Sequence, residues 1–403
     1  MASVRTVVRA LHRWPSFVVG FVALAVGLSG SILTFREEIE HALYEPRIEP
    51  GSRTATLAEA LAKAGAVDPL RRVSVIVLPD RPERPLQFIL QKRGALSLKE
   101  ADQWTVYASP YDGKVLSWRS RETSGIARLR DLHFALFGGV TGLVVNGWMA
   151  LVLALIALSG VVLWFQTATR GRRFRITRTG SWKRTVWDLH RVGGIVFALL
   201  LATAALSGAY YSFRETFTRL LASATGPLAP RATPTVEGPA GASALDADAI
   251  AGAARAVMPD LRLAVLRPPS QPNQAWAATF HRPGDQGEST DSGPTAFLNP
   301  YTGAVLRLDD RRTMSPGGRI LKTMEPLHYG KLFGLPGRLV WFFVGLTPGL
   351  LFVSGLLMWW NRTRGLRPRR AAAPILALAL PVAGQTASGG SARAASLVRP
   401  DGT

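Results

Sequence analysis

The stretch from Leu189 to Glu215, LHRVGGIVFALLLATAALSGAYYSFRE, determines how the rest of the chain can be interpreted. It begins with a histidine between a leucine and an arginine. It continues as an apolar run long enough for a helix to cross a bilayer core of about 30 Å. A second stretch of the same length, from Leu11 to Glu37, is LHRWPSFVVGFVALAVGLSGSILTFRE. In both stretches the histidine precedes a Ser-Gly pair by 17 residues, so the chain contains an internal repeat.

The repeat continues beyond these two stretches. His133 lies 26 residues before Ser159-Gly160, and His328 lies 26 residues before Ser354-Gly355. Each half therefore runs as helix, outer segment, helix. Both halves enter the membrane in the same direction, as parallel repeats related by an axis along the membrane normal.

Apolar segments in each half are expected to span a membrane as helices. The first has a basic start like a signal peptide, but Phe35–Glu38 follows it where a cleavage site would need small residues, so we interpret it as an uncleaved anchor. The segments contain no Asp, Glu, Lys or Arg, which argues against an iron or siderophore permease. The four expected spans are 17–35, 143–165, 193–213 and 339–360.

The two outer segments are polar and carry strand-like runs separated by Pro and Gly. Both contain the turn pattern Pro-Tyr-x-Gly, at 110–113 and 300–303, and each has one helical run, at 57–64 and 247–257. We therefore expect two small α+β domains. The expected strands are 73–78, 86–90, 104–108, 275–280 and 304–308.

Basic residues gather beside the apolar spans. The formal net charge is +21, and the segment 166–191 alone holds eight basic residues against one acidic residue. This distribution follows the positive-inside rule. We therefore expect a multi-pass protein of the bacterial inner membrane, with both termini in the cytoplasm and the outer segments in the periplasm. The same distribution argues against a nucleic-acid partner, because topology and membrane lipid account for the charge.

The expected fold is a membrane α-helical bundle of four transmembrane helices, formed by tandem duplication, with two periplasmic α+β domains. The end of the chain is rich in Gly, Ser and Ala, which is typical of disorder. The expected parts are the N-terminus with the first membrane helix at 1–35, the first outer domain at 36–130, the periplasmic entry and second helix at 131–165, a basic cytoplasmic loop at 166–189, the third helix at 190–213, the second outer domain at 214–325, the periplasmic entry and fourth helix at 326–360, and a basic and then disordered tail at 361–403.

Four of the six histidines lie in the repeated sequence motifs. His12 and His190 lie at the cytoplasmic ends of their spans, and His133 and His328 lie at the periplasmic entries. An axis that relates the two halves would place His12 opposite His190 and His133 opposite His328. Two histidines that face each other across a helix bundle are what bis-imidazole ligation of haem iron requires. We therefore expect these four histidines to ligate two haem irons, one near each membrane face.

The chain has no cysteine, which excludes disulfides, thiolate iron–sulfur clusters, c-type haem and cysteine-based zinc sites. Haem is favoured over a bare metal because no carboxylate recurs beside the histidines in both halves. Glycines along the spans could make room for a porphyrin or could be ordinary helix contacts. Arg13 and Arg191 could pair with haem propionates or act as positive-inside anchors. His41 and His281 lie outside the repeated sequence motifs and are expected to be solvated.

The chain resembles the PepSY-associated transmembrane family, also called iron-regulated membrane proteins, over nearly its whole length. The resemblance implies an inner-membrane protein with periplasmic PepSY-like domains. Some members of the family are ferric-siderophore reductases that hold haem b with histidines between their helices. The resemblance rests on these sequence motifs: Leu11–Trp14, Gly30–Glu37, Leu132-His133, Asp188–Arg191, Leu327–Gly330 and the two Pro-Tyr-x-Gly turns.

These expectations combine into a ferric-siderophore reductase with two bis-histidine haem b groups. Electrons would pass from an external donor, a membrane quinol or a cytoplasmic reductase, to a ferric siderophore or another periplasmic acceptor. The donor must be external because the short cytoplasmic loop has no room for a flavin or nicotinamide domain. The alternative is a non-catalytic PepSY membrane protein for periplasmic binding, sensing or peptidase regulation. Tyr111, Tyr301, Trp104 and Trp276 could contact a siderophore, but the repeated turn and the domain cores explain them better.

Overall fold

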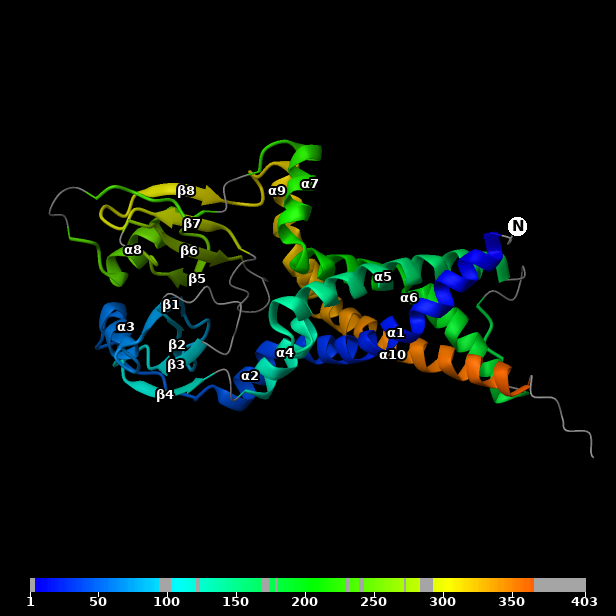
Figure 1. Cartoon of the computed structure of the whole chain (residues 1–403). Helices are drawn as coiled ribbons and strands as arrows, with labels where there is room; N and C mark the ends of the chain where they lie inside the picture. The colour runs from blue at the N-terminus through cyan, green and yellow to red at the C-terminus, as the bar shows by residue number, and fades with distance from the viewer. Residues whose placement is uncertain are drawn as a thin grey trace, which may run out of the picture. The chain divides into compact units, whose positions relative to one another are not determined.

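The same order of helices and strands occurs in each half of the chain (Figure 1). The computed structural model describes residues 4–93, 103–120, 124–167, 174–177, 180–228, 232–238, 243–271, 273–282 and 293–365. Residues 1–361 form one compact unit that holds both halves. Most of the tail expected to be disordered, and part of the expected basic loop, lie outside the described residues.

Each half begins and ends with a long helix and has helices and four strands between them. The first half consists of α1 (Val4–Leu33), α2 (Arg36–Tyr44), α3 (Leu57–Gly65), β1 (Arg71–Val77), β2 (Leu86–Lys92), β3 (Gln103–Ala108), β4 (Val115–Ser120), α4 (Gly125–Ala135) and α5 (Gly139–Thr167). The second consists of α6 (Trp182–Ser212), α7 (Arg214–Thr225), α8 (Ala247–Val257), β5 (Arg262–Arg267), β6 (Trp276–His281), β7 (Thr295–Leu298), β8 (Val305–Asp309), α9 (Pro316–His328), the short 3-10 helix η3 (Lys331–Phe333) and α10 (Gly334–Gly365).

Among the described residues, four helical segments are long and apolar enough to cross a membrane, and they overlap the four expected spans. They are α1, α5, α6 and the segment 331–364 that holds η3 and α10. All four begin before the expected starts, because the helices include residues that precede the apolar runs, whereas α1 and α6 end at Leu33 and Ser212, just short of the expected ends. For example, α6 begins at Trp182, where the Ser181 hydroxyl accepts a hydrogen bond from the Lys183 backbone. The chain is therefore a multi-pass membrane protein.

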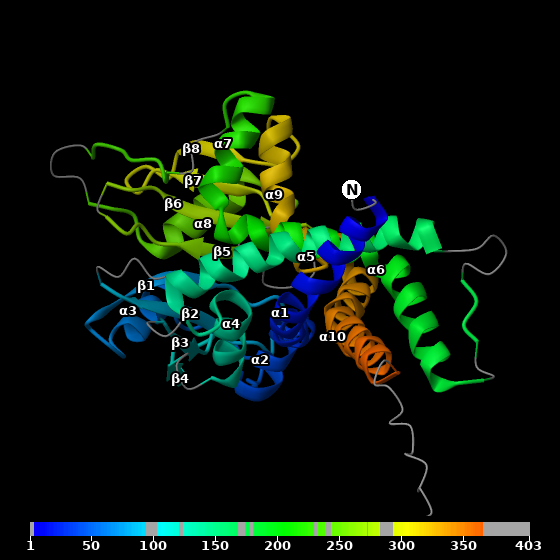
Figure 2. The same cartoon turned by 45° about the vertical axis from the view of Figure 1, so that its right-hand side comes forward.

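Small residues let the membrane helices α1 and α10 approach closely, and Figures 1 and 2 show these helices side by side. A Cβ atom on Gly27 would lie 2.3 Å from the carbonyl oxygen of Gly345. Near this contact, Ser31 Oγ donates a hydrogen bond to the Phe342 carbonyl at 2.8 Å. These glycines serve the helix contact that is common in membrane bundles.

The strands of both halves join in one eight-stranded sheet with the order β4-β3-β2-β1-β5-β6-β7-β8. The halves meet where β1 pairs antiparallel with β5, with Ile76 opposite Leu266 and Val77 opposite Val265. The outer segments, which we expected to form two domains, are thus continuous at the level of the sheet. The sequence indicated β1, β2, β3, β6 and β8, whereas β4, β5 and β7 were not expected.

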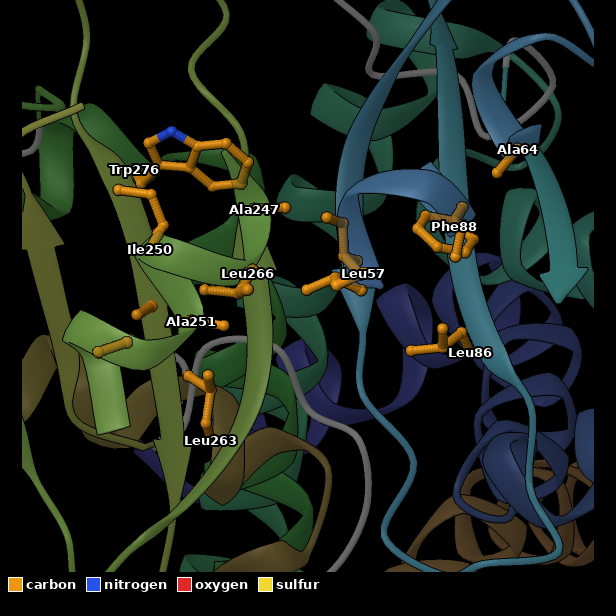
Figure 3. Close-up of a cluster of buried hydrophobic side chains, with 14 of the residues drawn as sticks. Leu57, Ala64, Leu86, Phe88, Ala247, Ile250, Ala251, Leu263, Leu266 and Trp276 are labelled. Carbon is orange, nitrogen blue, oxygen red and sulfur yellow. The ribbon is translucent and has the colours of Figure 1, made fainter. Parts of the chain in front are cut away.

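One face of this sheet packs against α3 and α8 and forms the main hydrophobic core. Figure 3 shows side chains from both halves in this core, including Leu57, Phe88, Ile250 and Leu266. Strand β2 shows the period of two that such packing requires, because Leu86, Phe88 and Leu90 are buried while the residues between them are half-buried. The core therefore belongs to both halves together.

Hydrogen bonds between α8 and α3 support this joint core. Both carboxylate oxygens of Asp248 accept hydrogen bonds from the first turn of α3, from Leu57 N at 3.0 Å and Ala58 N at 2.8 Å. A carboxylate at a helix N-terminus satisfies backbone donors and interacts favourably with the helix dipole. Asp248 therefore ties the second half to the first.

The opposite face of the sheet borders a cleft of about 2450 Å³. Residues Gln87 and Ile89 of β2 line it, and they alternate with the core residues of the same strand. Residues of several helices also line it, among them His133 of α4 and His328 of α9. We call this space the sheet-side cleft.

Candidate cofactor-binding site

His12 of α1 and His190 of α6 face each other across the helices. Their ring centroids lie 6.4 Å apart and their ring planes are perpendicular. Asp188, two residues before His190, accepts a hydrogen bond from Thr177 N in the connection between the halves at 3.1 Å. We therefore call His12 and His190 the loop-side pair.

His133 of α4 and His328 of α9 form a second pair, which lines the sheet-side cleft. Their ring centroids lie 6.1 Å apart, with an angle of 48° between the ring planes. His328 is the last residue of α9, and Gly330 then adopts a φ of +70°, which allows the chain to turn into α10. We call His133 and His328 the sheet-side pair. The structure thus brings together the histidines that the repeat pairs.

In the first half, the Ser-Gly pair of α5 holds the His12 ring, and the Ser-Gly pair of α1 holds the His133 ring. His12 Nδ1 lies 3.0 Å from both the Ile156 carbonyl oxygen and Ser159 Oγ. His133 Nδ1 lies 2.8 Å from the Val26 carbonyl oxygen and 3.4 Å from Ser29 Oγ. In both cases the carbonyl belongs to the residue three positions before the serine.

The second half repeats this arrangement. His190 Nδ1 lies 2.8 Å from Ser354 Oγ, and the backbone of Leu351 is its further hydrogen-bond partner. His328 Nδ1 lies 2.9 Å from Ser207 Oγ, with the backbone of Ala204 as the equivalent partner. The carbonyls again precede the serine by three residues. All four imidazoles therefore engage Nδ1 in the same way.

The glycine of each Ser-Gly pair provides the space for a ring. A Cβ atom on Gly30 would lie 2.7 Å from Cε1 of His133, which is closer than any real Cβ contact. A Cβ atom at Gly30 would therefore displace the His133 imidazole. The corresponding distances are 3.1 Å for Gly160 and His12, 3.1 Å for Gly208 and His328, and 3.4 Å for Gly355 and His190.

This geometry suits ligation of a metal through Nε2. Because Nδ1 donates to a backbone carbonyl, Nε2 is the ring nitrogen left with a lone pair, and such outer hydrogen bonds are usual for metal-bound histidines. An iron held between two imidazoles at about 2 Å from each nitrogen separates the ring centroids by about 6 Å. Both pairs have this separation. The donor set therefore fits a bis-histidine haem.

A bare metal ion fits less well. Within the described residues, no group of three or more His, Cys, Asp or Glu side chains could hold a metal. Two imidazoles alone leave most coordination positions of an ion empty, whereas a porphyrin brings four nitrogen ligands of its own. The two-histidine sites thus suit a macrocycle better than a free ion.

The Ser-Gly pairs are functional candidates that sequence analysis missed. In the sequence they served only as markers of the repeat, although their constant spacing from the histidines pointed to a link between the two. The structure assigns them a shared task, which is to hold and orient the imidazoles. Glycines in the spans thus include some that make room for histidine rings and others that join helices, such as Gly27 and Gly345.

The two arginines beside the loop-side pair differ in their surroundings. Arg191 Nη2 contacts Asp188 Oδ1 at 3.2 Å and the Arg175 carbonyl at 3.1 Å. Asp188 is fully buried, so Arg191 neutralises a buried carboxylate. Arg13 packs on the ring of Trp14, and its buried Nε has no hydrogen-bond partner among the described residues. Arg13 is therefore the better candidate for contact with an anionic group.

The family model described as PepSY-associated TM region matches residues 9–362. The chain belongs to this family. A search of the curated proteins finds no match to the chain. The matched range includes both histidine pairs of this PepSY-associated protein and all four of their Ser-Gly pairs.

The expectation that His281 is solvated is wrong. It is 3% exposed, and its Nδ1 lies 3.2 Å from Arg262 Nη2. Every residue of β6 is buried, and this strand lies inside the sheet between β5 and β7. His41 is half-buried and contacts Glu45 and Arg84. The contacts of both histidines are therefore with residues outside the two histidine pairs.

The aromatic residues considered as siderophore contacts have structural roles. Tyr111 Oη donates to the Pro82 carbonyl at 2.9 Å, which fixes the first Pro-Tyr-x-Gly turn. Trp104 stacks on Trp118 at 4.5 Å between ring centroids. Trp276 is 6% exposed and belongs to the main core. These contacts agree with the turn and core interpretation.

Proposed function

We propose that this protein is a haem-dependent reductase of the bacterial inner membrane that holds one haem b at each histidine pair and delivers electrons to a ferric siderophore. The observation that supports the proposal most is the arrangement of four imidazoles in two facing pairs, with ring centroids 6.4 and 6.1 Å apart. The same hydrogen bonds at Nδ1 orient all four rings. When bound, haem supplies the reversible one-electron chemistry that the side chains of this protein lack.

The chain's own residues bind and orient in this proposal. His12 and His190 would hold one haem iron, and His133 and His328 would hold the other. The serine hydroxyls and backbone carbonyls at Nδ1 fix the ring orientation and raise the basicity of Nε2.

The direction of transfer follows from charge. Excess basic residues near the loop-side pair favour the cytoplasm for that end, and the sheet then faces the periplasm. The donor is a membrane quinol or a reduced cytoplasmic protein. Each ferric siderophore accepts one electron and becomes the ferrous chelate. Its hard oxygen donors hold Fe(II) less tightly than Fe(III), so reduction favours release of iron.

An absorption spectrum of the purified full chain, oxidised and dithionite-reduced, tests the proposal. We expect a b-type spectrum, and we expect His12→Ala or His190→Ala, like His133→Ala or His328→Ala, to lose about half of the bound haem. His41→Ala, outside both pairs, is the matched control and should keep the full amount. A wild-type protein that neither contains haem nor takes it up would contradict the proposal and favour a binding or sensing role for the outer segments.

A further inference from the structure

Two buried hydrogen-bond donors beside the sheet-side pair have no partner among the described residues. They are the Tyr211 hydroxyl at the end of α6 and the Trp341 indole N–H in α10. Buried donors in folded proteins are almost always satisfied, and an unsatisfied one carries a desolvation penalty. Two of them in one region indicate that a group outside the chain completes their hydrogen bonds.

Both donors belong to the wall of the sheet-side cleft. The Tyr211 ring lies 5.5 Å from the His328 ring, edge to face, and stacks on Tyr329 with an interplanar angle of 6°. Trp341 packs against Gly330, the residue after Tyr329, where an added Cβ would lie 2.8 Å from Trp341 Cβ. These contacts fix both donors next to the sheet-side histidines.

Only the second half carries these donors. The repeat places Leu33 at the position of Tyr211 and Asn146 at the position of Trp341. Asn146 Nδ2 donates to the His133 carbonyl at 2.7 Å and to the Phe134 carbonyl at 3.2 Å, so its donor is already used. At these two positions, therefore, the second half offers unused donors to the sheet-side cleft and the first half does not. The difference is not required by the seating of the histidines, which is alike in both halves.

We infer that the second-half wall of the sheet-side cleft is a subsite for oxygen atoms that accept hydrogen bonds from Tyr211 and Trp341. An indole N–H can only donate, and a tyrosine hydroxyl donates readily, so the ligand must present acceptors. Carboxylates of a bound porphyrin and the oxygen donors of a ferric chelate share this chemistry. The inference rests on the proposed function, since it names what the sheet-side pair would hold or reduce.

The test uses the purified full chain with Tyr211→Phe, Trp341→Phe and the double variant. Tyr210→Phe is the matched control, because the neighbouring Tyr210 is also buried and its hydroxyl already accepts from Arg214 Nε at 3.2 Å. One measurement is a spectroelectrochemical titration of the haem without any acceptor. The other is binding of a redox-inert gallium(III) trihydroxamate to the oxidised protein. Haem content and the thermal midpoint report whether each variant is folded.

Each source of the oxygen atoms gives its own result. If they belong to the porphyrin carboxylates, each variant changes the relative affinity for the two redox states about fivefold and lowers one of the two midpoint potentials by about 40 mV, at 59 mV per tenfold change. If they belong to the chelate, the potentials stay constant and the dissociation constant of the gallium complex rises about fivefold per variant.

Absence of both effects, with the variants equal to Tyr210→Phe, would overturn the inference while leaving the proposed function intact. A wild-type protein without haem would instead contradict the proposed function. In that case the gallium complex alone decides the inference: weaker binding by the variants supports it, and no binding or unchanged binding overturns it.

Discussion

The Nδ1 atom of His133 lies 2.8 Å from the carbonyl oxygen of Val26, a residue 107 positions earlier in the chain. This carbonyl begins a five-residue segment that ends in Ser29-Gly30, and each long membrane helix has an equivalent segment that ends in Ser-Gly. Within each half, the Ser-Gly segment of the first long helix contacts the histidine that precedes the second long helix. The Ser-Gly segment of the second long helix contacts the histidine near the start of the first. Across the halves, the seated histidines meet as pairs. Hydrogen bonds within one half thus orient each imidazole, and the oriented imidazoles form pairs between the two halves.

Replacing Gly30 with alanine should empty the sheet-side pair while sparing the loop-side pair. The added Cβ would lie 2.7 Å from His133 Cε1 and would push the ring from its seat. We expect affinity at that pair to fall about 10- to 100-fold, as for other residues that orient metal-bound histidines. Haem content per protein, measured by absorbance, should fall by about half. Gly193→Ala is the control, because a Cβ there meets nothing within 4 Å. Equal losses in both variants would contradict the steric explanation.

Replacing Ser354 with alanine should have a milder effect than removing His190. The substitution deletes the hydroxyl 2.8 Å from His190 Nδ1 but keeps the backbone partner at Leu351. With one acceptor fewer the imidazole becomes less basic, so the midpoint potential of that site should rise and haem affinity should fall by less than about tenfold. Thr203→Ala is the matched control, since its hydroxyl bonds to the Leu199 carbonyl of its own helix. A complete loss of haem in Ser354→Ala would show that the hydroxyl, rather than the carbonyl, holds the ring.

The Arg338–Glu38 ion pair should respond unequally to loss of its two partners. Arg338 is 3% exposed and contacts Glu38 Oε2 at 2.6 Å and the Thr34 carbonyl at 2.8 Å. Glu38→Gln leaves a buried guanidinium without its carboxylate, at a cost of about 3 kcal/mol. Arg338→Met leaves a carboxylate whose side chain is 54% exposed and can be hydrated, so it should cost less.

Thermal unfolding in detergent would compare these variants. The control is Glu215→Gln, because Glu215 and Arg219 are exposed and 3.5 Å apart, and such pairs contribute little. If Arg338→Met lowered the melting temperature more than Glu38→Gln, the burial argument would be wrong. The double variant should recover part of the loss of Glu38→Gln, because no buried charge then remains.

The carboxylate of Glu45 should make stability depend on pH. Burial alone would raise its pKa, but hydrogen bonds from His41 and Arg84 outweigh burial and lower the pKa of Glu45 below its usual value. A lowered folded-state pKa means that this carboxylate stabilises the fold above the unfolded-state pKa of about 4.3 and loses that contribution as the pH falls through the folded-state pKa.

Glu45→Gln should therefore melt a few degrees lower than the wild type at neutral pH, and the difference should shrink in acid. Melting curves at a series of pH values between neutral and about 3 would measure this. Glu59→Gln, at the exposed capping box of α3, is the control for loss of an ordinary carboxylate. A difference between Glu45→Gln and wild type that grew in acid would reverse the assigned sign.

Local features predicted much of the fold. The apolar runs indicated four spans, since a lipid environment requires long apolar helices whatever the tertiary structure. The expected helical run 247–257 coincides with α8. Strands were harder, because β7 has only four residues, all buried, and its sequence lacks the alternation by which β2 was recognised. The burial of His281 was missed for the same reason, since it follows from neighbours on other strands.

The sequence by itself determined the repeat, the spans and which histidines correspond, because equal spacing along two helices is a property of the chain alone. Only the tertiary structure decided that the Ser29-Gly30 segment seats His133, that Asp188 holds Arg191, and that β1 and β5 join the outer segments in one sheet. The first and last of these contacts link residues more than a hundred positions apart, and Asp188–Arg191 becomes significant because packing buries the carboxylate. Such relations depend on how the helices and strands pack, which local spacing does not specify.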